Sequence, residues 1–231
     1  MLTGEEFYHL TKVLRAKIGE EHILCVNDGN DYLSRLISIT KEEAIFKIEN
    51  VVKNTAENPY RVTLYQAVIK GERMENTVQK AVELGVSEIV PFENAYSNAK
   101  ADAKKVERFR KIVLEAAKQC GRSLLPQVRE TTQFKKILEE LSLYDAVVYC
   151  NEYEKEKNFL PALHSREICR MEKIAVVIGS EGGFSPEEEA TLRSKQNVLS
   201  VSLGKRILRA DTAVTVALGV LDAYFDGEIA Q

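Results

Sequence analysis

The sequence has few cysteines and histidines: four cysteines and three histidines among 231 residues. Cys25, Cys120, Cys150 and Cys169 lie far apart and form no C-x-x-C pair, so neither a zinc site nor a disulfide framework is indicated. The three histidines are equally scattered. We therefore expect reduced thiols, a cytoplasmic location and no bound metal.

Long apolar runs and an excess of positive charge are also missing. No run approaches the roughly 18 apolar residues that a membrane span needs, and the start, Met1–Glu6, lacks the pattern of a signal peptide. The formal net charge is −3. Any contact with nucleic acid must therefore come from a local basic patch.

Two stretches near the end of the chain share one pattern. In Val176–Glu188 and again in Val201–Ala213, an apolar run typical of a buried strand leads into a glycine-containing loop and then into a helix. Glycine lets the backbone approach a ligand closely. Two such loops at the carboxyl ends of neighbouring strands predict a ligand-binding crevice in an α/β protein.

The first of these loops, residues 179–183, matches none of the common nucleotide or hydrolase motifs. It is not G-x-G-x-x-G, it carries no Gly-Lys-Ser/Thr, and it is not G-x-S-x-G. Ser180 has no histidine near it in the sequence, so a nucleophilic role is not indicated. What remains is a neutral pocket rich in backbone groups, which suits an adenosine-type ligand without a triphosphate.

The first 60 residues predict a short helix over 1–12, followed by a small β-rich domain. Short strand-like runs with tight turns between them are typical of a small barrel. An RNA-binding barrel and an ordinary β-rich domain both fit this pattern. Residues 53–59 are polar, end in Pro59 and form the best linker candidate. The expected strands are 22–26, 32–39 and 44–52.

Beyond the linker the pattern changes to alternating strands and helices, which predicts a parallel sheet. Ser185 and Pro186 predict the start of one helix, and Gly121 predicts the end of another. The expected strands are 61–68, 87–91, 145–150, 173–178 and 198–201, and the expected helices are 72–84, 102–121, 133–141, 186–195 and one that starts near Asp211.

Basic residues collect at predicted strand ends beside the glycine loops. Taken singly, each fits a solvated surface charge, but grouped at one edge they would contact the phosphates of a nucleic acid. They are Lys70, Arg73, Lys80, Arg122, Lys205, Arg206 and Arg209.

Together these residues form a recognisable ordered set. G-x-E-G-G-F spans Gly179–Phe184 and L-G-x-x-I-L-R spans Leu203–Arg209, after Lys70–Met74 and Gly121–Arg122. With this set the chain resembles, over nearly its whole length, the RsmE family of the SPOUT methyltransferases. Members of that family methylate the N3 nitrogen of one uridine in 16S ribosomal RNA of the small subunit.

The resemblance implies a fold. Residues 1–56 would form a PUA-like RNA-binding β-barrel, and residues 60–231 a SPOUT α/β domain whose chain end forms a deep trefoil knot. Family members usually carry one more strand before Leu2–Glu5, so we expect the barrel to lack its first strand. Ser180 stands where the family often has proline, and Asp211 replaces a more usual glutamate. A homodimer is also implied.

The resemblance further implies that S-adenosylmethionine is the cofactor, held mainly by backbone groups of the two glycine loops. The cofactor-binding residues would be Ile178, Gly179, Glu181, Gly182, Gly183, Ser202, Leu203, Gly204, Ile207, Leu208, Arg209 and Ala213.

Catalysis would need a cation beside the uracil carbonyl oxygens and a group that helps to remove the N3 proton. Arg209 or Arg122 is expected as the cation. Glu181 and Asp211 are candidates for the base, although loop bracing and helix N-capping are their plain structural roles. RNA would be bound by Arg15, Lys70, Arg73, Lys80, Arg122, Lys205 and Arg206.

Two other functions remain open. One is a non-catalytic RNA-binding or ribosome-assembly factor, against which the intact glycine loops and Arg209 argue. The other is a SPOUT methyltransferase that acts on another RNA, such as tRNA. The expected partners are 16S rRNA, in the assembled small subunit, and a second copy of the chain, with no membrane.

Overall fold

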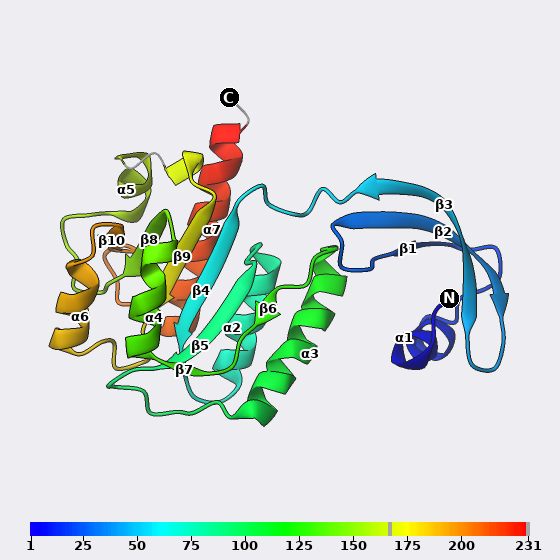
Figure 1. The fold of residues 1–231 in the computed structure, drawn as a ribbon, viewed down its shortest axis with the longest axis horizontal. Coiled ribbons are helices and arrows are strands. Elements are labelled where there is room, and N and C mark those ends of the chain that lie inside the picture. The colour runs from blue at the N-terminus through cyan, green and yellow to red at the C-terminus, as the bar shows by residue number, and fades with distance from the viewer. Residues whose placement is uncertain (166–167, 230–231) are drawn as a thin grey trace. The chain divides into compact units, whose positions relative to one another are not determined.

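The structure is a computed structural model that describes residues 1–165 and 168–229. The chain divides into two compact units (Figure 1). Met1–Glu57 and Gly121–Leu124 form the first, and the described residues of 58–120 and 125–229 form the second. The stretch 121–124 was expected in the C-terminal domain, but it belongs to the first unit.

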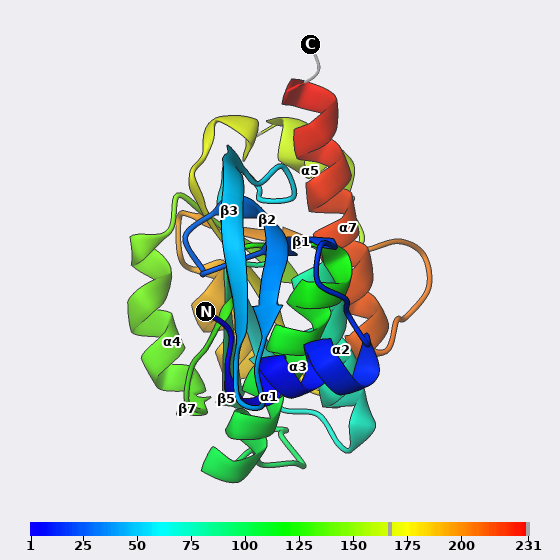
Figure 2. The same ribbon diagram turned by 90° about the vertical axis from the view of Figure 1, so that its right-hand side faces the viewer.

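The first unit contains a three-stranded antiparallel sheet of order β1-β2-β3, which Figure 2 views from the side of the N-terminus. Leu10, Leu36, Ala44 and Phe46 form its core. Leu2 adds a single bridge to Ala44, and in the part of the chain that is described no further strand joins β3 to β1. The expected barrel is therefore an open sheet here. Its elements are α1 (Gly4–Tyr8), the π-helix η1 (His9–Val13), β1 (Glu21–Leu24), β2 (Asn30–Ile39) and β3 (Ala44–Lys53).

The second unit confirms the predicted parallel α/β fold. Among the described residues its sheet has seven strands in the order β10-β8-β9-β4-β5-β6, with β7 paired to β5, and every pairing is parallel. The strands are β4 (Arg61–Ala67), β5 (Glu88–Glu93), β6 (Gln127–Val128), β7 (Thr132–Gln133), β8 (Ala146–Cys150), β9 (Lys173–Ile178) and β10 (Val198–Val201).

Helices cover both faces of this sheet (Figure 1). Because side chains alternate along a strand, Leu64 and Val176 face α2, α3, α5 and α7, whereas Tyr65 and Val177 face α4 and α6. The helices are α2 (Glu72–Glu83), α3 (Ala103–Cys120), α4 (Phe134–Glu140), η2 (Leu141–Leu143), α5 (Phe159–Ser165), η3 (Ile168–Arg170), α6 (Pro186–Arg193) and α7 (Ala210–Ile229).

Local signals placed several helix ends correctly. The Ser185 hydroxyl accepts a hydrogen bond from the Glu188 N–H, and the Glu188 carboxylate accepts one from the Ser185 N–H, which makes a capping box at α6. Gly121 follows α3 with a φ of +77°. Asp211 lies inside the first turn of α7, so the expected N-cap role is wrong.

The short elements β6, β7 and α5 were not predicted. The trefoil knot stays a prediction, since strand order alone does not decide it. None of the described helices is both long and apolar enough to cross a membrane. Cys25, Cys120 and Cys150 are free thiols, and the Cys169 side chain lies outside the described part.

Candidate active site

A cavity of about 390 Å³ opens in the second unit at the carboxyl ends of β8, β9 and β10. These strands are neighbours in the sheet, so the loops that follow them meet at one edge. This is where parallel α/β sheets bind ligands. The two glycine loops were predicted to meet in this way.

The loop after β9 turns tightly against the sheet. The Gly183 N–H donates to the Ser180 carbonyl at 2.9 Å, and Gly183 has a φ of +69°. A Cβ added at Gly179 would lie 2.9 Å from Cε2 of Phe184, so a larger residue does not fit there. The Gln66 amide, at the end of β4, donates to the Gly179 carbonyl at 3.3 Å. The loop is thus fixed from the neighbouring strand.

The loop after β10 is held by its own hydroxyl group. The Ser202 hydroxyl donates to the Gly204 carbonyl at 3.0 Å and accepts from the Gly204 N–H at 3.2 Å. Gly204 has a φ of +125°, a conformation that favours glycine. The Ser202 N–H also donates to the carbonyl of Lys157, which joins this loop to the segment after β8.

That segment after β8 forms a third wall, which the sequence analysis missed. Asn151, Glu152 and Tyr153 line the cavity. The Asn151 N–H donates to the Val201 carbonyl, and its side-chain oxygen accepts from the Tyr153 N–H at 2.9 Å. Since residues 145–150 were expected as a strand of the parallel sheet, the polar residues directly after it were a usable signal.

The cavity contains charges of both signs. Glu152, Glu181 and Glu189 contribute carboxylates, and three arginines contribute cations. Burial, together with the charge of Glu189, raises the pKa of Tyr149, which stays a neutral phenol. Burial likewise raises the pKa of the Cys150 thiol. The arginines are Arg73, Arg206 and Arg209.

The structure brings most of the predicted cofactor residues together. Gly182 does not line the cavity; a Cβ there would lie 2.9 Å from Cβ of Tyr96. The predicted cofactor residues that line the cavity are Ile178, Gly179, Glu181, Gly183, Ser202, Leu203, Gly204, Ile207, Leu208, Arg209 and Ala213.

Of the predicted catalytic residues, Arg209 and Glu181 line the cavity, whereas Asp211 and Arg122 do not. Asp211 is half-buried, and its Oδ1 has no hydrogen-bond partner among the described residues. Arg122 is buried in the first unit and pairs with Glu57. Its guanidinium is therefore engaged in a structural contact, which argues against phosphate binding. Its catalytic role stays a prediction.

The other predicted RNA-binding residues are exposed. Arg73 and Arg206 line the cavity. Lys80 pairs with Glu83 of the same helix at 2.7 Å. Arg15, Lys70 and Lys205 are exposed, and none of them lines the cavity. In the described chain, no three histidine, cysteine or acidic residues are placed to share a metal ion.

Comparison with known proteins places this architecture in a family. Residues 56–222 match the RNA methyltransferase domain, and residues 2–49 match the PUA domain of RNA methyltransferases. The ribosomal RNA small subunit methyltransferase E of Bacillus subtilis is 30% identical over 226 residues, covering 95% of this chain and 88% of the relative. The chain belongs to the RsmE family of RNA methyltransferases.

Solved structures of the family agree with this assignment. The ribosomal RNA small subunit methyltransferase E of Neisseria gonorrhoeae, bound to S-adenosyl methionine, has a TM-score of 0.85 at 29% identity and covers 96% of this chain and 90% of that one. A Legionella pneumophila methyltransferase in complex with the same cofactor has a TM-score of 0.83 at 31% identity, again covering 96% and 90%.

Proposed function

We propose that this chain methylates the N3 nitrogen of one uridine in 16S ribosomal RNA of the small subunit, with S-adenosylmethionine as methyl donor. The observation that carries the proposal is the cavity at the ends of β8, β9 and β10. Its walls are built from the two motif-bearing loops, and they lie within the part of the chain that matches the RNA methyltransferase domain.

The residues around the cavity fit this cofactor. Its volume lies in the range of about 300–1,000 Å³ that small-molecule sites have. Backbone groups of the glycine loops and the apolar side chains of Ile178 and Leu203 suit an adenosine. The carboxylates and arginines suit the opposite charges of an amino acid. Nδ2 of Asn151 is buried with no hydrogen-bond partner among the described residues, so a donor is left over beside the cavity.

When bound, S-adenosylmethionine would supply a methyl group on a positively charged sulfur. The protein must orient the uracil, help to remove the N3 proton and stabilise the negative charge that spreads onto the neighbouring carbonyl oxygens. In this reaction the N3–H bond would be replaced by an N3–C bond, and a base would take the proton. The bond between sulfur and the methyl carbon would break, with its electron pair left on sulfur. Arg209 would provide the cation, and Glu181 and Asp211 remain the candidates for the base.

The proposal extends to the partners. The first unit and the exposed basic residues would bind RNA around the target, which must be unstacked so that its N3 edge is reachable. A homodimer, the assembled small subunit as substrate and a cytoplasmic location belong to the same proposal.

The test is methyl transfer from labelled S-adenosylmethionine to small subunits that lack the modification, with tRNA and naked rRNA as controls. Label recovered as N3-methyluridine in the subunit RNA is the expected result. Labelled tRNA would indicate another RNA substrate. Binding of S-adenosylmethionine without labelling of any RNA would contradict the proposal and favour a binding factor.

A further inference from the structure

Arg73 reaches the cavity from the helix that follows β4, a strand that carries neither of the glycine loops. It lies in the first turn of α2, directly after the loop that leaves β4. Gly71 makes the turn into the helix with a φ of +66°. Because β4 pairs with β9, this turn lies beside the loop that contains Glu181, and Arg73 joins the cavity wall.

Glu181 connects the loop after β9 with the turn that leads from β4 into α2. Its Oε1 accepts a hydrogen bond from the Lys70 N–H at 3.2 Å and lies 3.8 Å from Nη1 of Arg73. The carboxylate therefore fixes the start of α2 and attracts the guanidinium. At 3.8 Å the pair is held by charge rather than by a hydrogen bond, so the N–H groups of Arg73 remain available for another acceptor.

The arginines of the cavity differ in how they are held. Arg206 and Arg209 come from the exposed loop after β10, and neither has a carboxylate within ion-pair distance in the described part of the chain. Arg73 is 44% exposed beside Glu181, which is 31% exposed. Arg73 is thus a cation with a fixed neighbour and a free face. Such preorganisation is what makes a charge effective in catalysis.

We propose that Arg73 is a catalytic residue that donates hydrogen bonds to a carbonyl oxygen beside N3 of the target uracil, and that Glu181 is its positioning residue. The inference rests on the proposed function. Arg73 then acts as a cation in addition to Arg209, and Glu181 is a support rather than the base. The planar fork of arginine suits a carbonyl oxygen on which negative charge develops.

The experiment compares Arg73→Met and Arg73→Lys with the wild type in single-turnover methyl transfer at saturating RNA and cofactor. Binding of S-adenosylmethionine is measured separately by calorimetry. For Arg73→Met we expect the rate constant to fall about 10²–10³-fold, as on removal of one donor to a developing oxyanion. Its cofactor Kd should stay within about threefold, a change below ~1 kcal/mol. Arg73→Lys should recover part of the rate, because it keeps the charge but loses the fork.

Arg108→Met is the matched control. Arg108 also pairs with a glutamate near this region, Glu75 at 2.6 Å, but it is 66% exposed and does not line the cavity. This variant should retain the wild-type rate. Thermal denaturation of every variant separates loss of fold from loss of function.

The role of Glu181 is tested by a double-mutant cycle. Glu181→Gln should slow transfer in the wild-type background and have little further effect once Arg73 is methionine, since residues that act together are not additive. Additive effects of the two substitutions would overturn the positioning role.

Four outcomes would overturn the role of Arg73. An unchanged rate constant with a raised KM for RNA and a weaker salt dependence would make it a phosphate contact. A raised cofactor Kd with the rate restored at saturating cofactor would make it a cofactor contact. A wild-type protein that methylates no RNA would overturn the proposed function and this inference together, whereas an active wild type with an equally active Arg73→Met would overturn the inference alone.

Discussion

The guanidinium of Arg122 lies 2.9 Å from the carboxylate of Glu57, in a pair whose side chains are only 5% and 12% exposed. The second carboxylate oxygen of Glu57 accepts the main-chain N–H groups of Ser123 and Leu124 at 3.0 and 2.8 Å. The Glu57 side chain therefore holds the stretch 121–124 in the first unit. The pair explains why Arg122, a residue of the sequence motif, is buried in the first unit.

Loss of this pair should destabilise the protein. Arg122→Met leaves a buried carboxylate without its cation, which costs about 3–5 kcal/mol, whereas the double variant with Glu57→Gln should recover part of that loss. Urea unfolding followed by circular dichroism measures both. Arg108→Met, which removes an exposed ion pair, serves as control and should cost less than about 1 kcal/mol. If Arg122→Met and Arg108→Met lost the same free energy of unfolding, the importance of the buried pair would be contradicted.

Gly179→Ala should weaken cofactor binding. The new Cβ would lie 2.9 Å from Cε2 and 3.1 Å from Cδ2 of Phe184, a buried ring packed against Phe92, Phe134 and Tyr149. Relief of this clash must move the loop, so we expect at least about a tenfold rise in the S-adenosylmethionine Kd, or ~1.4 kcal/mol, measured by calorimetry.

The control for this prediction is Gly219→Ala. Its Cβ would meet only Leu84, at 4.0 Å, inside a helix. It should leave the cofactor Kd unchanged and stabilise the helix by about 0.5–1 kcal/mol. A Kd for Gly179→Ala that equals the wild-type value would show that the loop tolerates a side chain.

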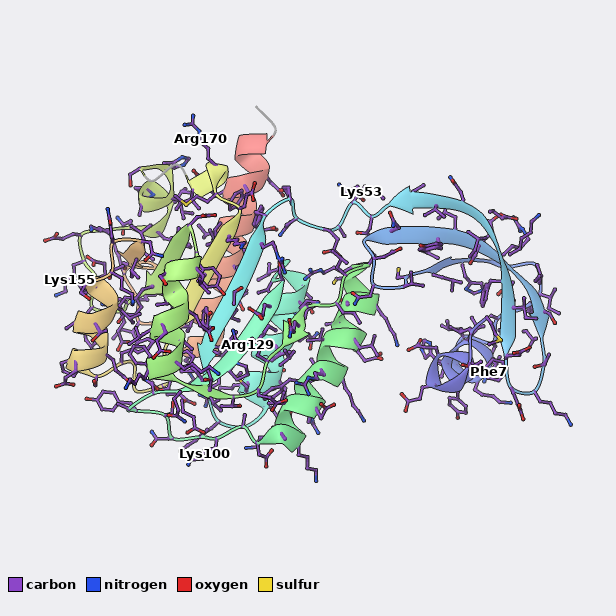
Figure 3. All side chains as sticks on the ribbon, in the orientation of Figure 1. Phe7, Lys53, Lys100, Arg129, Lys155 and Arg170 are labelled. Atoms are coloured by element: carbon purple, nitrogen blue, oxygen red, sulfur yellow. The ribbon has the colours of Figure 1, made fainter. Side chains whose placement is uncertain are left out.

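Stability should fall in acid through Glu140. Arg129, which Figure 3 labels, donates two hydrogen bonds of 2.7 Å to the Glu140 carboxylate, and the Tyr65 hydroxyl donates a third at 3.0 Å. The hydrogen bonds from Arg129, and then that from Tyr65, lower the pKa of Glu140 from its ordinary value of 4.5. The unfolded chain then binds this proton more readily, so the stabilisation is complete above the ordinary value and is lost as pH falls through the folded pKa.

The variant Glu140→Gln tests that assignment. At pH 7 it should be less stable than the wild type by about 2 kcal/mol, as for hydrogen bonds to a charged group, and the difference should shrink as pH falls below 4.5. Urea midpoints at pH 7 and pH 3.5 measure it. The exposed neighbour Glu139→Gln is the control and should follow the wild type at both pH values. A difference independent of pH would refute the role of the Glu140 charge.

The parts of the site that were predictable from the sequence are those with a local pattern. The strand before Gly179 and the strand before Ser202 are short apolar runs followed by glycine, and each alone indicates a loop at a strand end. The predicted parallel sheet then places the two loops together. The capping box of Ser185 and Glu188 lies within four residues and is equally readable.

The parts that were missed depend on distant partners. Glu57 and Arg122 are 65 residues apart, and nothing in either segment indicates that they pair. Asn151 follows an expected strand, but its place in the cavity wall also depends on the strand order, in which β8 lies between β10 and β9. Glu181 lies 111 residues from Lys70, whose N–H it accepts, so its bracing partner was equally hidden. Motif patterns thus identify the loops, and tertiary contacts decide what each charge does.

Arg209→Ala should abolish methyl transfer and leave cofactor affinity within a few-fold. Arg209 lines the cavity, is exposed and directly precedes α7. A cation beside the developing charge stabilises the transition state rather than the bound cofactor. Single-turnover transfer and calorimetry measure the two effects. Unchanged turnover would remove Arg209 from the mechanism.

RNA affinity should depend on salt through the loop after β10. Lys205 and Arg206 are both exposed in this loop. Neither has an acidic neighbour in the sequence, since Gly204 precedes the pair and Ile207 follows it. Each phosphate contact releases counterions, so the slope of log K against log salt should be less steep by about 0.7–0.9 for each contact removed. Lys205→Ala and Arg206→Ala should therefore each weaken RNA binding and flatten the slope by nearly one unit, measured by filter binding between low and moderate salt.

Lys80→Ala is the comparison, because Lys80 already pairs with Glu83 at 2.7 Å and should change the slope less. A wild-type affinity that does not change with salt would contradict the basic patch as a whole, and equal slopes in all three variants would show that this loop does not contact phosphate.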